Sequence, residues 1–230
     1  MNTAFYEEWK QKRVNKIVNI FGSDWFAFKN VLELGACYGD IGYEFIKLGS
    51  NVTFVEGRQS NISILKKRLN SKHIRPNVLC LDQNQPYSFN LKYDLVLHLG
   101  VLYHLENWQQ DLTCAINHAK MMILETVVST TKNELAEPGI ATTYGNDSKY
   151  TGLTEKSVVP TQEEIEQHLI NSNCKFVRLD TADLNTSWSW SDETQIRHVY
   201  DWKYRNIHLY TNPSFPKSIL HYRRMWLILI

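Results

Sequence analysis

The chain has 230 residues, 43% of them hydrophobic, and it carries 25 lysines and arginines against 24 aspartates and glutamates. This length and apolar content suffice for one buried core, so we expect a single domain over residues 1–230. The near-balanced charge provides no overall field that would hold a polyanion, so nucleic acid is not supported as a partner.

The cysteines and the N-terminal segment bear on the cellular compartment. Cys37, Cys80, Cys114 and Cys174 stand singly, without the close pairs of a zinc site or the density of a secreted disulfide scaffold. The first residues lack an apolar signal-type segment, and no run of about 18 apolar residues appears. We therefore expect a cytoplasmic protein with reduced thiols, without a metal site and without a membrane span.

The first predicted element is an amphipathic helix. From Ala4 to Phe21, apolar residues recur at mostly helical spacing with charges between them, and Gly22 follows as a stop. Residues 1–30 are expected to form a helical lid ahead of the first strand.

Short apolar runs then alternate with helical segments. The runs are rich in β-branched residues, as in strands that are covered on both faces. They occupy residues 31–34, 51–56, 77–82, 93–99 and 121–127. The helical segments between them occupy residues 40–48, 61–69 and 108–118. This alternation predicts an α/β fold with a doubly wound, parallel sheet.

The last third of the chain adds one helix and two strands. Thr161 and Glu164 form a capping box that opens a helix reaching about Ile170. Residues 175–184 and 218–230 are the sixth and seventh predicted strands. Two segments without helical or strand periodicity, 129–159 and 185–213, are expected to be insertions on the substrate side, since long loops in compact domains usually serve as lids or binding segments.

A glycine loop at residues 31–42, VLELGACYGDIG, is the most informative phrase. An apolar strand ends close to an acidic residue and leads through Gly35 and Gly39 into a helix. These glycines allow a tight turn and close approach of a ligand, and the helix offers free N–H groups. A ligand over this turn is favoured, with a purely structural connection as the alternative.

Two further strand ends carry polar groups. Glu56 ends its strand about twenty residues after the loop, where a carboxylate can accept both hydroxyls of a ribose. Asp82 and Gln83 follow the next strand, where the edge of an adenine would lie. Three successive strand ends would thus present polar groups at one edge of the sheet, which is where α/β ligands bind.

These motifs resemble those of the class I S-adenosylmethionine-dependent methyltransferases. ELGACYG is similar to the glycine motif of that family, VEGR to its ribose motif, CLDQ to its adenine motif and YDLVLHLGVLYHLEN to its fourth motif. The resemblance is strong over residues 31–127 and extends to the flanks in outline. It implies a three-layer, Rossmann-like fold with a seven-stranded, mostly parallel sheet, an antiparallel last strand and an N-terminal helix. It also implies S-adenosylmethionine as methyl donor and S-adenosylhomocysteine as product.

The same resemblance implies contacts with the cofactor from all four motifs. The residues concerned are Glu33, Gly35, Ala36, Cys37, Gly39, Glu56, Gly57, Arg58, Asp82, Gln83, Leu99 and Gly100. Cys37 departs from the family pattern, because it replaces the usual middle glycine. That departure weakens the competing hypothesis of a nicotinamide-dependent oxidoreductase, because the pyrophosphate of its dinucleotide cofactor needs glycine at this place. A packing role for the Cys37 thiol is favoured over a nucleophilic one.

Three residues near the fourth strand are candidates for the methyl-transfer step. Transfer from a sulfonium is an in-line displacement, and a base helps only if the acceptor must lose a proton. His104 is the preferred base or orienting group, and Tyr103 is expected to pack near the sulfonium. His98 is also placed to face the transferred methyl group, and the alternative for either histidine is that it simply packs and hydrogen-bonds a neighbouring loop.

Three more residues are expected around the bound molecules. Arg13 would reach the cofactor carboxylate, and the Tyr6 ring would lie against the cationic donor, whereas Trp9 is expected in the core. Glu125, in the fifth strand, would either hydrogen-bond the acceptor or cap a loop.

The acceptor pocket is placed between the two insertions. Its predicted contacts are Tyr144, Trp188, Trp190, Arg197, His198 and Tyr200. An aromatic mini-core is the alternative for this cluster. The fourth motif has neither the [N/D]PP[Y/F] sequence of adenine-amino methyltransferases nor the carboxylates of a magnesium site. A small molecule, glycan or protein side chain therefore remains as acceptor, through oxygen or nitrogen, and a catalytically silent cofactor-binding module is the alternative function.

Overall fold

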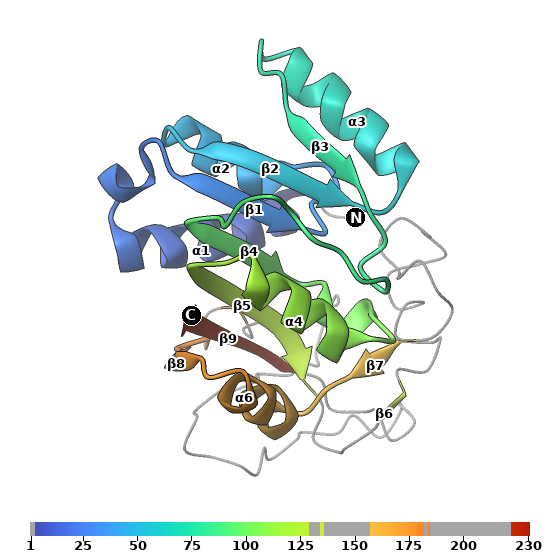
Figure 1. Ribbon diagram of the computed structural model, residues 1–230. Helices are drawn as coiled ribbons and strands as arrows, with labels where there is room; N and C mark the ends of the chain where they lie inside the picture. Colours follow the sequence, from blue (N-terminus) through green and yellow to red (C-terminus); the bar gives the residue numbers. More distant parts are fainter. Residues whose placement is uncertain (1–2, 129–133, 136–156, 182–183, 185–221) are drawn as a thin grey trace, which may run out of the picture.

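The computed structural model describes residues 3–128, 134–135, 157–181, 184 and 222–230, with the backbone alone for residues 3–6, 134–135 and 222. A seven-stranded sheet runs through the molecule in the order β3-β2-β1-β4-β5-β9-β8 (Figure 1). Its strands are β1 (Asn30–Leu34), β2 (Asn51–Glu56), β3 (Asn77–Cys80), β4 (Leu95–Leu99), β5 (Met121–Val128), β8 (Lys175–Leu179) and β9 (Tyr222–Leu229). Strands β1 to β5 pair in parallel, and β9 is antiparallel to both β5 and β8. The predicted fold class, with its antiparallel last strand, is confirmed.

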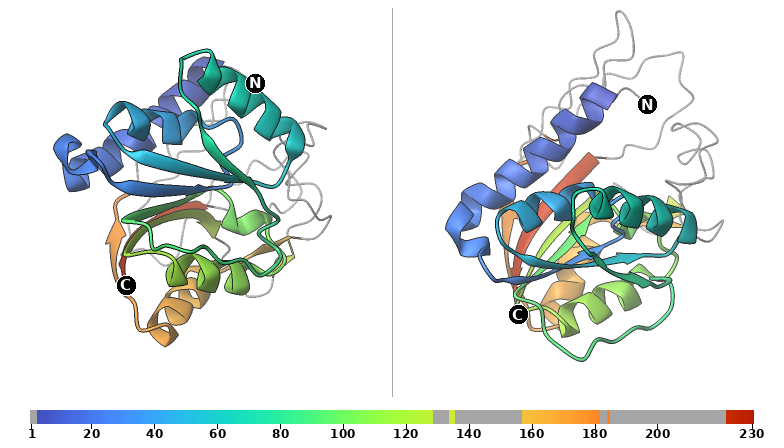
Figure 2. Two further views of the ribbon diagram at one scale, coloured as in Figure 1. Left: turned by 45° about the horizontal axis from the view of Figure 1, so that its top comes forward. Right: turned by 90° about the horizontal axis from the view of Figure 1, so that it is seen from above.

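Helices cover both faces of this sheet and make three layers (Figures 1 and 2). One face carries α1 (Thr3–Phe21), α2 (Asp40–Lys47) and α3 (Gln59–Asn70), and the other carries α4 (Trp108–Asn117) and α6 (Gln162–Asn171). The long α1 lies across the first face, as the second view in Figure 2 shows. The alternation of apolar runs and helical segments in the sequence therefore predicted the layers correctly.

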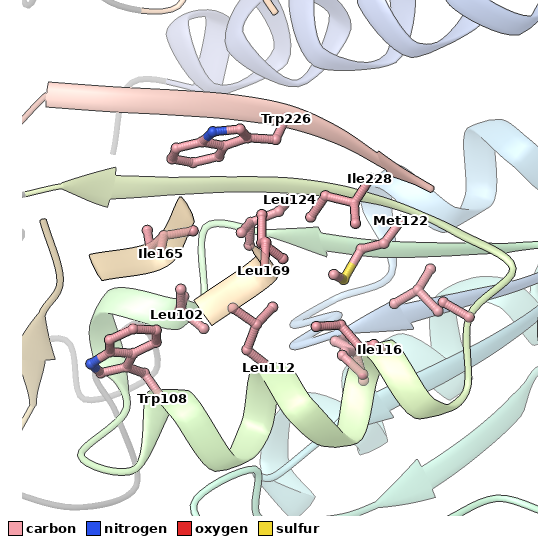
Figure 3. Packing of buried hydrophobic residues seen from close by; sticks show 14 of the residues in the cluster. Leu102, Trp108, Leu112, Ile116, Met122, Leu124, Ile165, Leu169, Trp226 and Ile228 are labelled. Atoms are coloured by element: carbon pink, nitrogen blue, oxygen red, sulfur yellow. The ribbon is translucent and has the colours of Figure 1, made fainter. Parts of the chain in front are cut away.

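Side chains of each strand alternate between two hydrophobic cores, because successive residues of a strand point to opposite faces. In β4, Leu95 and Leu97 belong to the core under α1, α2 and α3, whereas Val96 belongs to the core under α4 and α6. Figure 3 shows the second core, where Trp226 of β9 and Leu124 of β5 face the buried side chains of α4 and α6. Both faces of the central strands are thus apolar, as expected for a covered parallel sheet.

The helix α6 begins at the predicted capping box. The Thr161 side chain accepts a hydrogen bond from the backbone nitrogen of Glu164 at 3.1 Å, and the Glu164 carboxylate accepts one from the backbone nitrogen of Thr161 at 2.8 Å. This reciprocal pair satisfies two N–H groups that have no partner within the helix.

Several short elements differ from the sequence predictions. Strands β3 and β8 are shorter than predicted, and single turns of 3-10 helix, η1 (Ser23–Phe26) and η2 (Leu102–His104), were not anticipated as such. The segment 129–159 contains β6 (Glu134–Leu135) and β7 (Val158–Val159), which pair with each other. Elements of two to four residues are too short to show a period in the sequence, and this explains why they were missed.

Candidate functional site

The glycine loop between β1 and α2 makes a tight turn at the carboxyl end of the sheet. Gly35 and Gly39 have φ angles of 66° and 71°, in the left-handed region that favours glycine. A Cβ atom on Gly35 would lie 2.2 Å from Cγ2 of Val101, so a side chain there would displace the segment that follows β4. The loop is therefore packed directly against the end of β4.

The carboxylate of Glu56 fastens this loop to the end of β2. Its Oε2 accepts a hydrogen bond from the backbone nitrogen of Cys37 at 2.8 Å, and its Oε1 accepts one from the backbone nitrogen of Arg58 at 2.9 Å. Asn61 Nδ2 donates to the same Oε1 at 3.3 Å. Glu56 is only 6% exposed, so these donors hold its carboxylate in one orientation at the strand end where the ribose contact is predicted.

A second carboxyl group, that of Glu33, lies beneath the loop. It is buried, and its Oε2 accepts a hydrogen bond from the backbone nitrogen of Gly42 at 2.9 Å. Burial raises the pKa of Glu33 to about 8, because the lowering by Gly42 and Arg13 is outweighed by desolvation together with the carboxylates of Asp40 and Glu56. The Glu33 carboxyl is therefore mostly protonated at neutral pH.

The third acidic residue lies on the same edge of the sheet. Asp82 follows β3, and its Oδ1 accepts a hydrogen bond from the backbone nitrogen of Asn84 at 2.9 Å. The backbone nitrogen of Leu81 donates to the carbonyl of Glu56 at 3.3 Å, which joins the ends of β2 and β3. Because β1, β2 and β3 are neighbours and parallel, Glu33, Glu56 and Asp82 meet at one edge, as the motif spacing predicted.

Cys37 occupies the middle of the glycine loop with a φ angle of 49°, which is uncommon for a residue with a side chain. Burial, together with the nearby carboxylates of Glu56 and Asp40, raises the pKa of its thiol to about 12. A thiol with such a pKa is not ionised at neutral pH, so the structure supports packing over nucleophilic chemistry for Cys37.

The end of β4 turns sharply into η2. Gly100 has a φ angle of 75°, and its backbone nitrogen donates to the carbonyl of Glu125 at 2.8 Å. The rings of Tyr103 and His104 follow, with centroids 4.0 Å apart. Burial, together with the positive charges of Arg223 and Arg58, lowers the pKa of His104 to about 4. His104 is therefore a neutral and weakly basic imidazole at pH 7, which suits an orienting role better than proton removal.

Two arginines share the carboxylate of Glu125 beside this turn. Arg13 of α1 donates to Oε2, and Arg223 of β9 donates through Nη1 to Oε1 at 2.8 Å. Burial of Glu125 opposes its ionisation, but the two arginines outweigh this effect and hold the pKa of the carboxyl below its usual value. The ring centroid of Trp9 lies 3.2 Å from Cζ of Arg13 and 4.8 Å from Cζ of Arg223. This group anchors α1 to β5 and β9.

Arg223 also reaches the residues that follow β4. Its Nη2 donates to the hydroxyl oxygen of Tyr103 at 3.3 Å. The aromatic side chain predicted near the sulfonium is thereby connected to the cluster of Arg13, Glu125 and Arg223, which we call the arginine cluster.

Comparison with known proteins points to one fold. No family model matches this chain. Over 105 residues it is 31% identical to the ubiquinone biosynthesis O-methyltransferase of Rickettsia felis, and the match covers 44% of this chain and 43% of that relative. The N-terminal domain of EvdMO1, solved with S-adenosylhomocysteine bound, superposes with a TM-score of 0.60 at 17% identity over 74% of each chain. An S-adenosylmethionine-dependent methyltransferase from Clostridium acetobutylicum gives a TM-score of 0.60 at 15% identity, covering 98% of this chain and 92% of that one. This chain has the class I methyltransferase fold.

Within the class I methyltransferase fold, His98 does not face the edge where ligands bind. It is fully buried, and its Nε2 lies 2.5 Å from Oδ2 of Asp111. The prediction that His98 faces the transferred methyl group is corrected, because the alternation of side chains along β4 turns it toward α4. The alternative, packing with a hydrogen bond to a neighbouring loop, is observed in part: His98 packs in the interior, but its partner Asp111 belongs to the helix α4.

Arg13 and Glu125 are 2% and 0% exposed and bind each other. The position of α1 across the first face of the sheet brings them together. The contact of Arg13 with the cofactor carboxylate stays a prediction, as does the role of Glu125 in binding the acceptor or capping a loop. Trp9, expected in the core, is half-buried against the arginines.

Arg223 and Asp111 were not predicted as functional residues, although both leave a signal in the sequence. Arg223 is a charged residue inside an otherwise apolar strand, and Asp111 lies on the apolar stripe of α4 between Trp108 and Leu112. A charged side chain at a position that the periodicity marks as buried requires a partner in the interior. Such positions predict buried polar groups, but not the identity of the partner.

The remaining predicted contacts fall outside the described part of the structure. They are the Tyr6 side chain, Tyr144, Trp188, Trp190, Arg197, His198 and Tyr200. These contacts stay predictions.

The described residues contain neither a metal-binding cluster nor a membrane-spanning helix. No group of three or more His, Cys, Asp or Glu side chains among them is arranged to hold a metal ion. Of the helices that the structure describes, none combines the length and the apolar character needed to cross a bilayer.

Proposed function

We propose that this protein transfers a methyl group from S-adenosylmethionine to an oxygen or nitrogen atom of an acceptor and releases S-adenosylhomocysteine. The observation that carries this proposal is the Glu56 carboxylate, which backbone donors hold in one orientation between the glycine loop and the end of β2. A carboxylate at this place suits the two hydroxyls of a ribose.

The residues around this carboxylate fit an adenosyl sulfonium without phosphate. A dinucleotide would require a pyrophosphate to lie on the loop, where Cys37 replaces the glycine that such ligands need. The cofactor would supply a methyl group that is already activated on sulfur. The backbone of the loop at Gly35 and Gly39 would hold its methionine part, Glu56 its ribose, and Asp82 with Gln83 the edge of its base.

The acceptor would lie beyond η2, on the side of Tyr103 and His104. Because the His104 imidazole is neutral and weakly basic, it would orient the acceptor through a hydrogen bond, and any acceptor proton would leave to solvent. The printed name of the Rickettsia felis relative favours oxygen as the methylated atom. A small molecule is the favoured acceptor, with glycans and protein side chains as the other classes, and the insertions 129–159 and 185–213 would form its pocket in a single-domain cytoplasmic enzyme.

A cofactor-binding module without turnover is the second candidate. It is favoured by the low pKa of His104 and by the burial of His98, which leave no strong base among the histidines predicted for the reaction. Acceptors that lose no proton before transfer need no such base, and this favours the enzyme.

Calorimetric titration with S-adenosylmethionine and S-adenosylhomocysteine tests the binding half of this proposal. Glu56→Gln is expected to weaken both affinities by about tenfold or more, because a charge-assisted hydrogen bond is lost. Glu163→Gln, at an exposed position of α6, is the matched control and is expected to leave them unchanged. If the wild-type protein bound neither molecule, the proposed function would be wrong.

Turnover is tested separately by the release of S-adenosylhomocysteine with a panel of acceptors. Catechols, hydroxy acids, amines, oligosaccharides and peptides represent the proposed classes. Release with one class identifies the acceptor chemistry, whereas tight binding of both cofactor forms without release across the panel would favour the silent module.

A further inference from the structure

The glycine loop contains a tight turn over residues 36–39. The backbone nitrogen of Gly39 donates to the carbonyl of Ala36 at 2.8 Å, so Cys37 and Tyr38 are the two central residues of this turn. Cys37 has a φ of 49°, whereas turns with a positive φ at this position are dominated by Gly, Asn and Asp. Relative to glycine, a side chain disfavours the left-handed conformation by a factor of about 5 to 30 in the equilibrium constant. Contacts around the turn must offset this effect.

Arg68 reaches the turn from the last turn of α3. Its Nη1 donates to the backbone carbonyl of Tyr38 at 3.0 Å, and its Nη2 donates to Oδ1 of Asp40 at 2.5 Å. Asp40 is the first residue of α2, so one guanidinium joins the turn to the helix that follows it. The planar fork of arginine suits two acceptors at once, whereas the single nitrogen of a lysine cannot reproduce this geometry.

The backbone is thus held on both sides of the two central residues. Before them, the backbone nitrogen of Cys37 donates to the Glu56 carboxylate at 2.8 Å. After them, the carbonyl of Tyr38 accepts from Arg68. Two fixed peptide groups restrict the φ and ψ angles between them, and a strained conformation persists where its surroundings over-determine it. Glu56 supplies one of these restraints from β2, and Arg68 supplies the other from α3.

We propose that Arg68 is a positioning residue that holds the glycine loop in its binding conformation and offsets the strain at Cys37. This inference rests on the proposed function, because it takes the loop backbone as the place of the methionine part of the cofactor. Arg68 acts through the carbonyl of Tyr38 and through Asp40. A loop that is held in one conformation before binding gives a higher affinity than one that must first be ordered.

A double-mutant cycle of Arg68→Gln and Cys37→Gly tests this link. The measured quantity is the dissociation constant of S-adenosylhomocysteine, obtained by calorimetric titration. Arg68→Gln alone is expected to weaken binding by about five- to tenfold, because the loop then leaves its binding conformation for most of the time. In a Cys37→Gly background, Arg68→Gln is expected to weaken binding by less than about twofold, because glycine adopts a positive φ without steric cost.

Two further variants separate positioning from a general effect of charge. Lys67→Gln removes the same charge from an exposed neighbour on α3, and it is expected to leave the dissociation constant unchanged. Arg68→Lys keeps the charge but loses the fork, so we expect it to weaken binding by about threefold.

The melting temperature shows whether a loss of affinity reflects a loss of folded protein. The Arg68 side chain is 40% exposed in its pair with Asp40, and pairs of this kind contribute little to stability. Arg68→Gln is therefore expected to lower the melting temperature by only about 3 °C or less.

The outcomes distinguish the two levels of inference. If the wild-type protein bound neither S-adenosylmethionine nor S-adenosylhomocysteine, the proposed function would be overturned and this inference with it. If it bound S-adenosylhomocysteine but Arg68→Gln left the affinity unchanged, or if Lys67→Gln weakened binding equally, only the positioning role would be overturned. An equal effect of Arg68→Gln in both backgrounds would overturn the link with Cys37. Should Arg68→Gln fail to fold, an unchanged affinity in Arg68→Lys would overturn the positioning role.

Discussion

The carboxyl edge of the sheet has two halves that are built in different ways. At β1, β2 and β3, carboxylates are held by backbone N–H groups that lie near in the chain: Gly42 is 9 residues from Glu33, and Cys37 is 19 residues from Glu56. At β4, β5 and β9, Glu125 binds Arg13 and Arg223, which are 112 and 98 residues away. The proposed cofactor half is thus local in sequence, whereas the proposed acceptor half is assembled from distant segments.

This difference has a consequence for stability and specificity. Backbone donors are present whatever the side chains are, so the cofactor half depends mainly on glycine conformation and close packing. The acceptor half depends on side-chain charges that neutralise each other in the interior, where an uncompensated charge is costly. Substitutions should therefore disturb the two halves through different mechanisms.

The largest effect is expected in the acceptor half, from Glu125→Gln. Loss of this buried carboxylate leaves Arg13 and Arg223 without a shared counterion and should lower the free energy of unfolding by about 3–5 kcal/mol. Urea denaturation measures this change. Glu8→Gln breaks a pair with Lys12 whose glutamate side chain is 63% exposed, and it should change stability by about 0.5 kcal/mol or less. Equal effects of the two substitutions would contradict the role given to the arginine cluster.

In the cofactor half, Gly35→Ala is expected to have the next largest effect. The new Cβ would meet Val101 and would also require a side chain at positive φ, so we expect a loss of about 2–4 kcal/mol in unfolding free energy. Gly22→Ala is a matched control, because Gly22 has a φ of 82° but no atom within 4 Å of the added Cβ. Gly22→Ala should lower the free energy of unfolding by about 1 kcal/mol, which is the contribution of the positive φ alone. A Val101→Ala substitution should restore part of the stability of Gly35→Ala and none of that of Gly22→Ala.

The pH dependence of stability tests the protonated carboxyl in the cofactor half. The pKa of Glu33 is raised from 4.5 to about 8, so the folded protein binds more protons than the unfolded chain between these values. The contribution of Glu33 to stability is therefore complete below about pH 4.5 and is lost as pH rises toward 8. Glu33→Gln stays neutral, and its free energy of unfolding should rise relative to that of wild type by about 3–4 kcal/mol between pH 5 and pH 8. Denaturant titrations at both pH values measure the difference, and a constant difference would show that Glu33 is ionised throughout.

The smallest effect is expected for Cys37→Gly. Glycine relieves the positive φ of residue 37 but loses a partly buried side chain, so the two contributions should cancel to within about 1 kcal/mol. The thiol itself provides a second measurement. At pH 8 we expect alkylation of the exposed Cys80 to precede that of Cys37, whose pKa is raised to about 12. Rapid modification of Cys37 would contradict the packing role.

Much of the cofactor half could be predicted from residue order. The bends at Gly35 and Gly39, the carboxylate of Glu56 and the capping box at Thr161 each depend on a few consecutive residues with defined backbone preferences. The alternation of apolar runs and helices likewise determined the order of layers, since a strand buried on both faces needs helices on both sides.

Tertiary structure alone decided the partners of the buried charges. The sequence marks Arg223 and Asp111 as charged residues at buried positions, but it does not say that Arg223 meets Glu125 or that Asp111 meets His98 and Gln83. Those pairs depend on the register of β9 against β5 and on the side of β4 that α4 covers. Local preferences act over a few residues, whereas these contacts form only after the whole sheet has assembled, and for this reason the chain's own sequence specifies the cofactor loop more fully than the residues that face the acceptor.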